Sequence, residues 1–131
     1  MSIAAERVTR FFANQTAGAF DEDLLHPGFR AWTTTSGDMP AERYRTAPQQ
    51  LAAVFKGGLQ FEIDSIIVEG DRAAAEVRSH GVFHDGTAYD NRYVFIFELT
   101  DNQISSVAEH FHPEPVMTLL VPRLMELMKG D

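Results

Sequence analysis

Cysteine is absent from the 131 residues of this sequence, which excludes disulfide bonds, a thiolate nucleophile and a cysteine-ligated zinc site. Any catalysis must therefore use oxygen or nitrogen side chains. Basic residues are also scarce, because 11 Lys and Arg stand against 19 Asp and Glu and give a net charge of −8. Such a chain repels phosphate unless its cations cluster, and they do not cluster here. We therefore expect neither a nucleic acid nor an anionic membrane surface as a partner.

Long hydrophobic runs are missing as well. The apolar run at residues 119–121 is far shorter than the roughly 20 residues that a membrane-spanning helix needs. The first seven residues are amphipathic and lack the apolar segment of a secretory signal, so we expect a cytoplasmic protein. What is present is typical of a folded chain, since 44% of residues are apolar and 11% aromatic. This length suits one domain, residues 1–131.

The order of the predicted elements indicates an α+β fold. Apolar residues at positions 4, 8, 11 and 12 follow helical spacing, and the stripe turns polar at Gln15. A short helix at 18–25, a strand at 29–34 and a helix between Thr46 and Gly57 follow. Four strands joined by tight turns are then predicted at 59–68, 72–83, 88–99 and 103–112, before a helical tail at 113–131 that Pro122 breaks or kinks.

Helices followed by an antiparallel meander are typical of the α+β class. We expect a curved antiparallel sheet wrapped around the N-terminal helices, which leaves a conical cavity suited to a small-molecule ligand. The tail carries apolar residues at helical spacing. Three placements of the tail stay open: over the cavity mouth, against a second copy of the chain, or in the core of its own subunit.

The hairpin around Asp85-Gly86 allows the register of two strands to be predicted. If these two residues form the turn, His84 lies opposite Thr87 and every second residue from there shares one face. That face combines polar groups with large aromatic side chains, as a binding cavity does. Its members are Glu76, Arg78, His80, Asn91, Tyr93 and Phe95.

The last strand contributes Glu109 to the same cavity, because its apolar neighbours Val107 and Phe111 must be buried. Trp32, Phe61 and Phe111 are expected among the aromatic residues of the wall. In such a volume desolvation raises the pKa of a carboxylic acid, and a histidine transfers protons near neutral pH. The expected catalytic residues are Glu109, His80 and Arg78. The expected substrate-binding residues are Trp32, Glu76, Asn91, Tyr93, Phe95, Phe61 and Phe111.

Each assignment has a structural alternative. Glu76, Arg78 and Glu109 are equally compatible with a buried ion-pair network that braces the sheet, and His80 with a hydrogen-bonded core histidine. His110 and His112 are spaced to chelate a metal. Their parity points away from the cavity, so we expect no metal site and no cofactor.

Several stretches together resemble the nuclear-transport-factor-2-like superfamily, and within it the SnoaL-like polyketide cyclases and their ketosteroid-isomerase-like relatives. The stretches are Phe11-Phe12, Leu25-His26-Pro27 into Trp32, the hairpin from 70–72 to 93–95, and 104–111. The resemblance implies an α+β cone. The superfamily includes isomerases, cyclases, epoxide hydrolases, lyases and non-enzymatic proteins. The resemblance therefore implies one fold but several different functions.

The resemblance also implies roles for single residues. In related epoxide hydrolases an Arg and an Asp two residues apart, with an Asp on the last strand, activate water. Arg78 matches the Arg and Glu109 the last-strand Asp, but His80 replaces the intervening Asp, which argues against that mechanism here. In SnoaL-like cyclases an Asp near the last strand is the acid–base residue; its counterpart is Glu109 or His112, and parity favours Glu109.

These inferences lead to a cofactor-free acid–base enzyme acting on a small, mostly apolar, oxygenated substrate by isomerisation, cyclisation, hydration or C–C lysis. Glu109 or His80 would transfer the proton, and Arg78 would stabilise negative charge. One alternative is a non-catalytic ligand-binding domain. Another is an interaction module that dimerises through its outer sheet face, and a homodimer is expected.

Overall fold

The computed structural model describes residues 2–129, so residues 1, 130 and 131, the ends of the predicted domain and tail, lie outside the described residues. The elements, in chain order, are α1 (Ile3–Ala17), β1 (Leu25–Thr33), β2 (Gly37–Met39), α2 (Ala41–Val54), β3 (Gln60–Glu69), β4 (Arg72–Val82), β5 (Ala88–Thr100), β6 (Gln103–Phe111), α3 (Pro113–Pro115), the π-helical turn η1 (Val116–Leu120) and α4 (Val121–Lys129).

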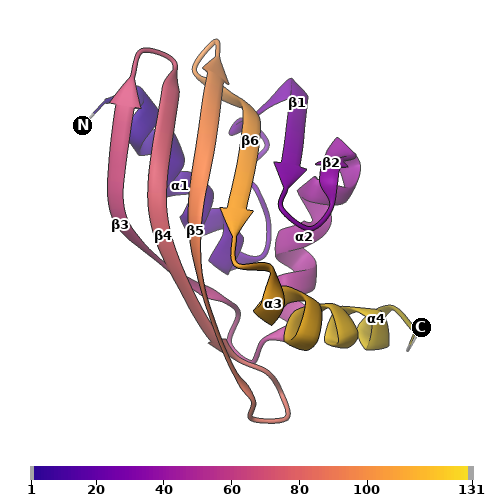
Figure 1. The fold of residues 1–131 in the computed structure, drawn as a ribbon. Helices are drawn as coiled ribbons and strands as arrows, with labels where there is room; N and C mark the ends of the chain where they lie inside the picture. The colour runs from indigo at the N-terminus through magenta and orange to yellow at the C-terminus, as the bar shows by residue number, and fades with distance from the viewer. Residues whose placement is uncertain (1, 130–131) are drawn as a thin grey trace.

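The predicted α+β class and curved sheet are confirmed. Six strands form one sheet in the order β2-β1-β6-β5-β4-β3, and α1 crosses one face of it while α2 packs beside β1 (Figure 1). One feature differs from the prediction, because β1 pairs with β6 in parallel. The sheet is therefore mixed. The antiparallel prediction holds for β3 to β6, which tight turns connect.

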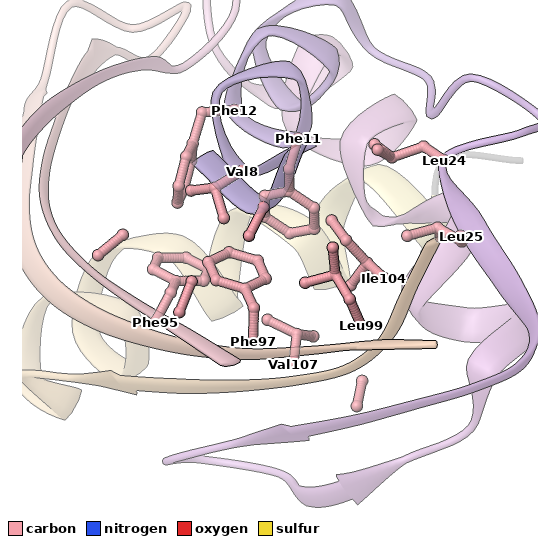
Figure 2. Packing of buried hydrophobic residues seen from close by; sticks show 14 of the residues in the cluster. Val8, Phe11, Phe12, Leu24, Leu25, Phe95, Phe97, Leu99, Ile104 and Val107 are labelled. Atoms are coloured by element: carbon pink, nitrogen blue, oxygen red, sulfur yellow. The ribbon is translucent and has the colours of Figure 1, made fainter. Parts of the chain in front are cut away.

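The core lies between α1 and the concave face of the sheet. Ser2 caps the N-terminus of α1 by accepting a hydrogen bond from the Ala5 amide. The apolar stripe of α1 then faces the aromatic residues of β5, as Figure 2 shows. Phe11 is fully buried, and its ring centroid lies 5.1 Å from that of Phe97. Phe12 meets Phe95 edge to face at 4.8 Å.

The helical segments after α1 differ from the prediction. The helix expected at 18–25 is wrong: the Asn14 side chain accepts a hydrogen bond from the Asp21 amide at 2.8 Å and holds a turn, and strand β1 begins at Leu25. Helix α2 begins at Ala41, earlier than expected, so Pro48 lies inside it. No helix among residues 2–129 combines the length and apolar character needed to cross a bilayer.

Pro122 does not break the C-terminal helix. The Val121 amide donates to the carbonyl oxygen of Val116, five residues earlier, which makes η1 a π turn immediately before the proline. Helix α4 then continues through Pro122 to Lys129. The π turn thus carries the chain into a proline-containing helix without ending it.

The β4–β5 hairpin has a register that differs by one residue from the prediction. Phe83 and Thr87 flank a three-residue loop, because the Phe83 amide donates to the Thr87 carbonyl at 2.9 Å. Gly86 occupies the left-handed region at φ +90°, as the last residue of such a loop commonly does. Val77 consequently lies opposite Tyr93, and Ser79 opposite Asn91. A shift of one residue moves every β4 side chain to the other face of the sheet.

We expect Gly86→Val to destabilise the protein by about 1–2 kcal/mol, because a β-branched residue is strained at this positive φ. Gly86→Asn should lose less than half as much, since asparagine tolerates the left-handed region. Urea unfolding of both variants measures the difference. Equal losses from Val and Asn would show that backbone conformation at this turn does not hold the register.

Candidate active site

A cavity of about 190 Å³ lies between the concave face of the sheet, helices α1 and α2, and the C-terminal segment. Its volume is below the roughly 300–1,000 Å³ common for drug-sized ligands. One wall is aromatic and is formed by Phe61, Tyr89, Tyr93, Phe95 and Phe111. The polar groups Gln15 and Tyr44 come from α1 and α2, and Glu109 lies beside Phe95 on the neighbouring strand. Exposed residues of the β1–β2 turn, Thr35 and Ser36, lie at the rim with Arg43.

The C-terminal segment contributes the remaining apolar wall. Val116, Leu120, Val121 and Leu124 line the cavity. Arg123 fastens the segment to the β4–β5 loop, because its guanidinium lies 4.2 Å from the Phe83 ring centroid and 2.8 Å from Asp85. Of the three placements that the sequence left open, residues 116–124 both line the cavity and pack in the core of their own subunit, and packing against a second copy stays a prediction.

Glu109 points into this cavity, as its parity on the last strand predicts. Val107 is buried on the same face of β6, and Phe111 lines the cavity with Glu109. Tyr44 donates a hydrogen bond to Oε2 of Glu109, which leaves Oε1 outside that bond. Burial raises the pKa of Glu109 from its ordinary 4.5 to about 7, and the Tyr44 hydrogen bond partly opposes this rise. Both protonation states are therefore populated near neutral pH.

Tyr44 is held rigidly by aromatic packing on the buried side of α2. Only 2% of the residue is exposed, and its ring packs against those of Phe20 and Phe29 at 6.1 and 5.5 Å. Burial, and then the nearby Glu109 charge, raise the pKa of Tyr44 well above its ordinary value. The phenol thus stays neutral and acts as a fixed hydrogen-bond donor to Glu109. The nearby Gln15 side chain opposes this rise in pKa.

A second polar group lies in the aromatic wall. The Tyr93 hydroxyl and Ser79 Oγ are 2.8 Å apart. Burial raises the pKa of Tyr93 well above its ordinary value, and the charges of Tyr89 and Glu109 add to this effect. Tyr93 is therefore a neutral donor, and it interacts electrostatically with Glu109 on the neighbouring strand.

Asn91 does not line the cavity but bonds Tyr89, which does. Its side chain is buried on the inner face of β5, where Nδ2 donates to Tyr89 Oη at 3.4 Å and to the His112 carbonyl at 3.1 Å. The amide is thus occupied by the protein itself. The expectation that Asn91 lines this cavity is wrong, because Tyr89 stands at the cavity wall instead.

The three remaining polar residues expected in the cavity lie on the outer face of the sheet. Arg78 binds both carboxylate oxygens of Asp64 at 2.8–3.1 Å and also pairs with Glu62. Glu76 accepts a hydrogen bond from a β3 serine, and His80 is exposed. The prediction that Glu76, Arg78 and His80 line the cavity is therefore wrong. The one-residue difference in the hairpin loop is the cause.

The outer ion pairs do not form the alternative buried network either. Arg78 and Asp64 are both substantially exposed, and exposed pairs stabilise proteins little. The Arg78 hydrogen bonds lower the pKa of Asp64. Glu109 lies on the other face, so the expected contact between Glu109 and Arg78 is absent from the arrangement of residues 2–129.

Trp32 also lies outside the cavity. In the parallel β1–β6 pairing it is matched with Ala108, and its ring centroid lies 4.8 Å from that of His110 on the outer face. Its strand neighbour Thr33 lines the cavity instead. The expectation that Trp32 forms part of the cavity wall is therefore wrong. Among residues 2–129, no three His, Asp or Glu side chains form a cluster able to hold a metal ion.

Two cavity residues, Gln15 and Tyr44, were not predicted. The signal for Gln15 was the polar end of the α1 stripe, where a glutamine occupies a position with apolar spacing. The signal for Tyr44 depends on where α2 begins. With the start at Ala41, Tyr44, Pro48 and Leu51 share one helical face, and Tyr44 and Leu51 both line the cavity.

Comparisons with solved structures return the same architecture. A protein from Jannaschia that is proposed to be a SnoaL-like polyketide cyclase is 24% identical, with a TM-score of 0.71 over 88% of this chain and 90% of that one. An NTF2-like protein from Anabaena variabilis is 23% identical, with a TM-score of 0.73 over 84% and 87%. IdmH from Streptomyces antibioticus, proposed to be a polyketide cyclase, is 13% identical, with a TM-score of 0.73 over 89% and 97%.

At these identities the similarities concern the fold alone. No protein with a curated function matches the sequence. The family comparison is more specific, because the model of the SnoaL-like domain matches residues 5–107, which run from α1 into β6. On that match the chain belongs to the SnoaL-like family.

Proposed function

We propose that this protein is an acid–base enzyme that moves a proton on a small, mostly apolar, oxygenated substrate. The observation that carries the proposal is the position of Glu109, a carboxyl group with a pKa of about 7 on the wall of an aromatic cavity. A group with this pKa accepts and returns protons efficiently at neutral pH. The polyketide cyclases among the structural neighbours support a carbonyl-containing substrate.

In the proposed step, ionised Glu109 removes a proton from a carbon next to a substrate carbonyl. The electron pair of the broken C–H bond forms a carbon–carbon double bond, and the π pair of the carbonyl group moves onto its oxygen, which gives an enolate. Protonated Glu109 then returns the proton to a different atom, which completes an isomerisation. In a cyclisation the enolate carbon first attacks a second carbonyl, and the proton goes to the resulting alkoxide. No net proton or electron is gained in either case.

Tyr93 replaces Arg78 as the residue that we propose to stabilise the enolate. Its neutral hydroxyl lies in the cavity wall and interacts electrostatically with Glu109. A preorganised neutral donor stabilises developing negative charge strongly where water is excluded. The aromatic wall and the C-terminal segment provide that exclusion, and Tyr44 positions the carboxylate.

Enolisation can be tested without the natural substrate by following deuterium exchange at the α carbons of 2-tetralone in D₂O by proton NMR. We expect the protein to accelerate exchange and Glu109→Gln to reduce the acceleration at least 100-fold, since general-base catalysis typically contributes 10²–10⁴-fold. Glu76→Gln, the same change on the outer face, should leave the rate unaltered. Binding of 2-tetralone without accelerated exchange would instead support the non-catalytic ligand-binding alternative.

The exchange rate should rise with pH and level off above a midpoint of about 7, because the ionised form of Glu109 is the base. Tyr44→Phe removes a hydrogen bond that favours this form, so we expect its midpoint to move upward by about one pH unit. Tyr93→Phe should lower the rate without moving the midpoint. If the Tyr44→Phe profile matched that of the wild type, Tyr44 would not position the base.

The same pKa predicts how stability depends on pH. Folding raises the pKa of Glu109 above its unfolded value, so the folded state binds the proton more tightly and stability falls as pH rises from about 4.5 to 7. Relative to wild type, Glu109→Gln should therefore gain stability across this window, by up to about 3 kcal/mol. Urea unfolding at several pH values measures the gain. A loss of stability at pH 8 would indicate that Glu109 is a structural residue.

A further inference from the structure

Gln15 is a buried polar residue of the cavity whose hydrogen-bonding capacity is only partly used. It lies near the C-terminal end of α1, is 4% exposed and lines the cavity beside Tyr44. Its carbonyl oxygen, Oε1, has no hydrogen-bond partner among residues 2–129. More than nine in ten buried polar groups in folded proteins have a partner, so an exception on a cavity wall calls for a specific explanation.

The orientation of the Gln15 amide follows from its neighbours. The Tyr44 proton is committed to Glu109, so the Tyr44 oxygen can only accept a further hydrogen bond. Gln15 lowers the pKa of the Tyr44 phenol, as a nearby amide N–H group does. The amide nitrogen of Gln15 therefore faces Tyr44. Turning the amide over would place two acceptors together, so Oε1 remains the end without a partner.

Helical spacing explains why this residue is buried at all. Val8, Phe11, Phe12 and Gln15 occupy successive positions of the stripe that faces the sheet. An apolar side chain at position 15 would satisfy the packing without leaving an acceptor unpaired. The glutamine thus lowers the stability of the unliganded protein, as residues at functional sites commonly do.

We propose that Gln15 Oε1 accepts a hydrogen bond from the substrate, and that the substrate is a small, largely cyclic compound carrying a hydroxyl or N–H group close to its reacting carbon. This inference deepens the proposed function and rests on it. Gln15, Tyr44 and Glu109 line the same cavity, and Tyr44 bonds Glu109, so the donor-binding atom lies in the same cavity as the base. The aromatic residues opposite select a flat, apolar body.

Indole and benzofuran test the proposal, because the two bicyclic molecules have nearly the same shape and only indole carries an N–H donor. Binding is measured by ¹⁵N NMR titration of the full-length protein. We expect the wild type to bind indole about threefold to tenfold more tightly than benzofuran, the range of one net hydrogen bond. Gln15→Met should abolish this preference. Gln50→Met, which changes a less buried glutamine of the same cavity, should retain it.

Urea unfolding of the unliganded variants separates recognition from a structural role. The midpoint of Gln15→Met should equal or exceed that of the wild type, because the variant removes an unpaired acceptor. An unchanged indole preference in Gln15→Met, or a clearly lower midpoint without loss of that preference, would overturn the proposal. Absence of binding by both probes would also overturn it. A failure of 2-tetralone exchange alone would refute catalysis by Glu109 while leaving the indole preference intact.

Discussion

Removal of water from the Glu109 carboxyl group is the interaction on which the candidate site depends. A glutamate on the outer face of this sheet would be a solvated acid, as Glu76 is. On the concave face, burial raises the pKa of Glu109 to about 7, while the buried Tyr44 phenol keeps the ionised form accessible. The balance between burial and a single hydrogen bond sets this pKa, although the cation of Arg43 lies at the cavity rim.

The register of the sheet decides which residues take part in that balance. Parity could be predicted on β6, because Val107 and Phe111 are apolar and Glu109 must share their face. On β4 the same reasoning failed. Ala75 and Val77 are small enough to lie beside the large aromatic residues of β5 on the inner face. The polar residues of β4 were instead assigned to that face because their chemistry suits a binding cavity. The three-residue loop, which ends with Gly86 at positive φ, shifts the register by one residue and places the polar residues of β4 on the outer face.

Contacts between distant segments explain the rest of what the sequence did not reveal. Trp32 was placed in the cavity for its aromatic character, but parallel pairing of β1 with β6 turns it toward His110. That pairing joins strands more than seventy residues apart, and no local pattern encodes it. Tyr44 reaches Glu109 across a separation of 65 residues. The order of β3 to β6 and the fold class were predictable, because alternation and tight turns are local signals.

The two faces of the sheet thus handle charge in opposite ways. On the outer face Arg78 bonds Asp64 in solvent, where ion pairs form and break at little cost. On the inner face the carboxylate of Glu109 is hydrogen-bonded to a neutral tyrosine, which is itself fixed by aromatic packing. A strong cation at Tyr44's position would hold the carboxylate ionised and lower its pKa. A neutral donor instead leaves Glu109 able to bind and release a proton, which is the property that acid–base chemistry needs.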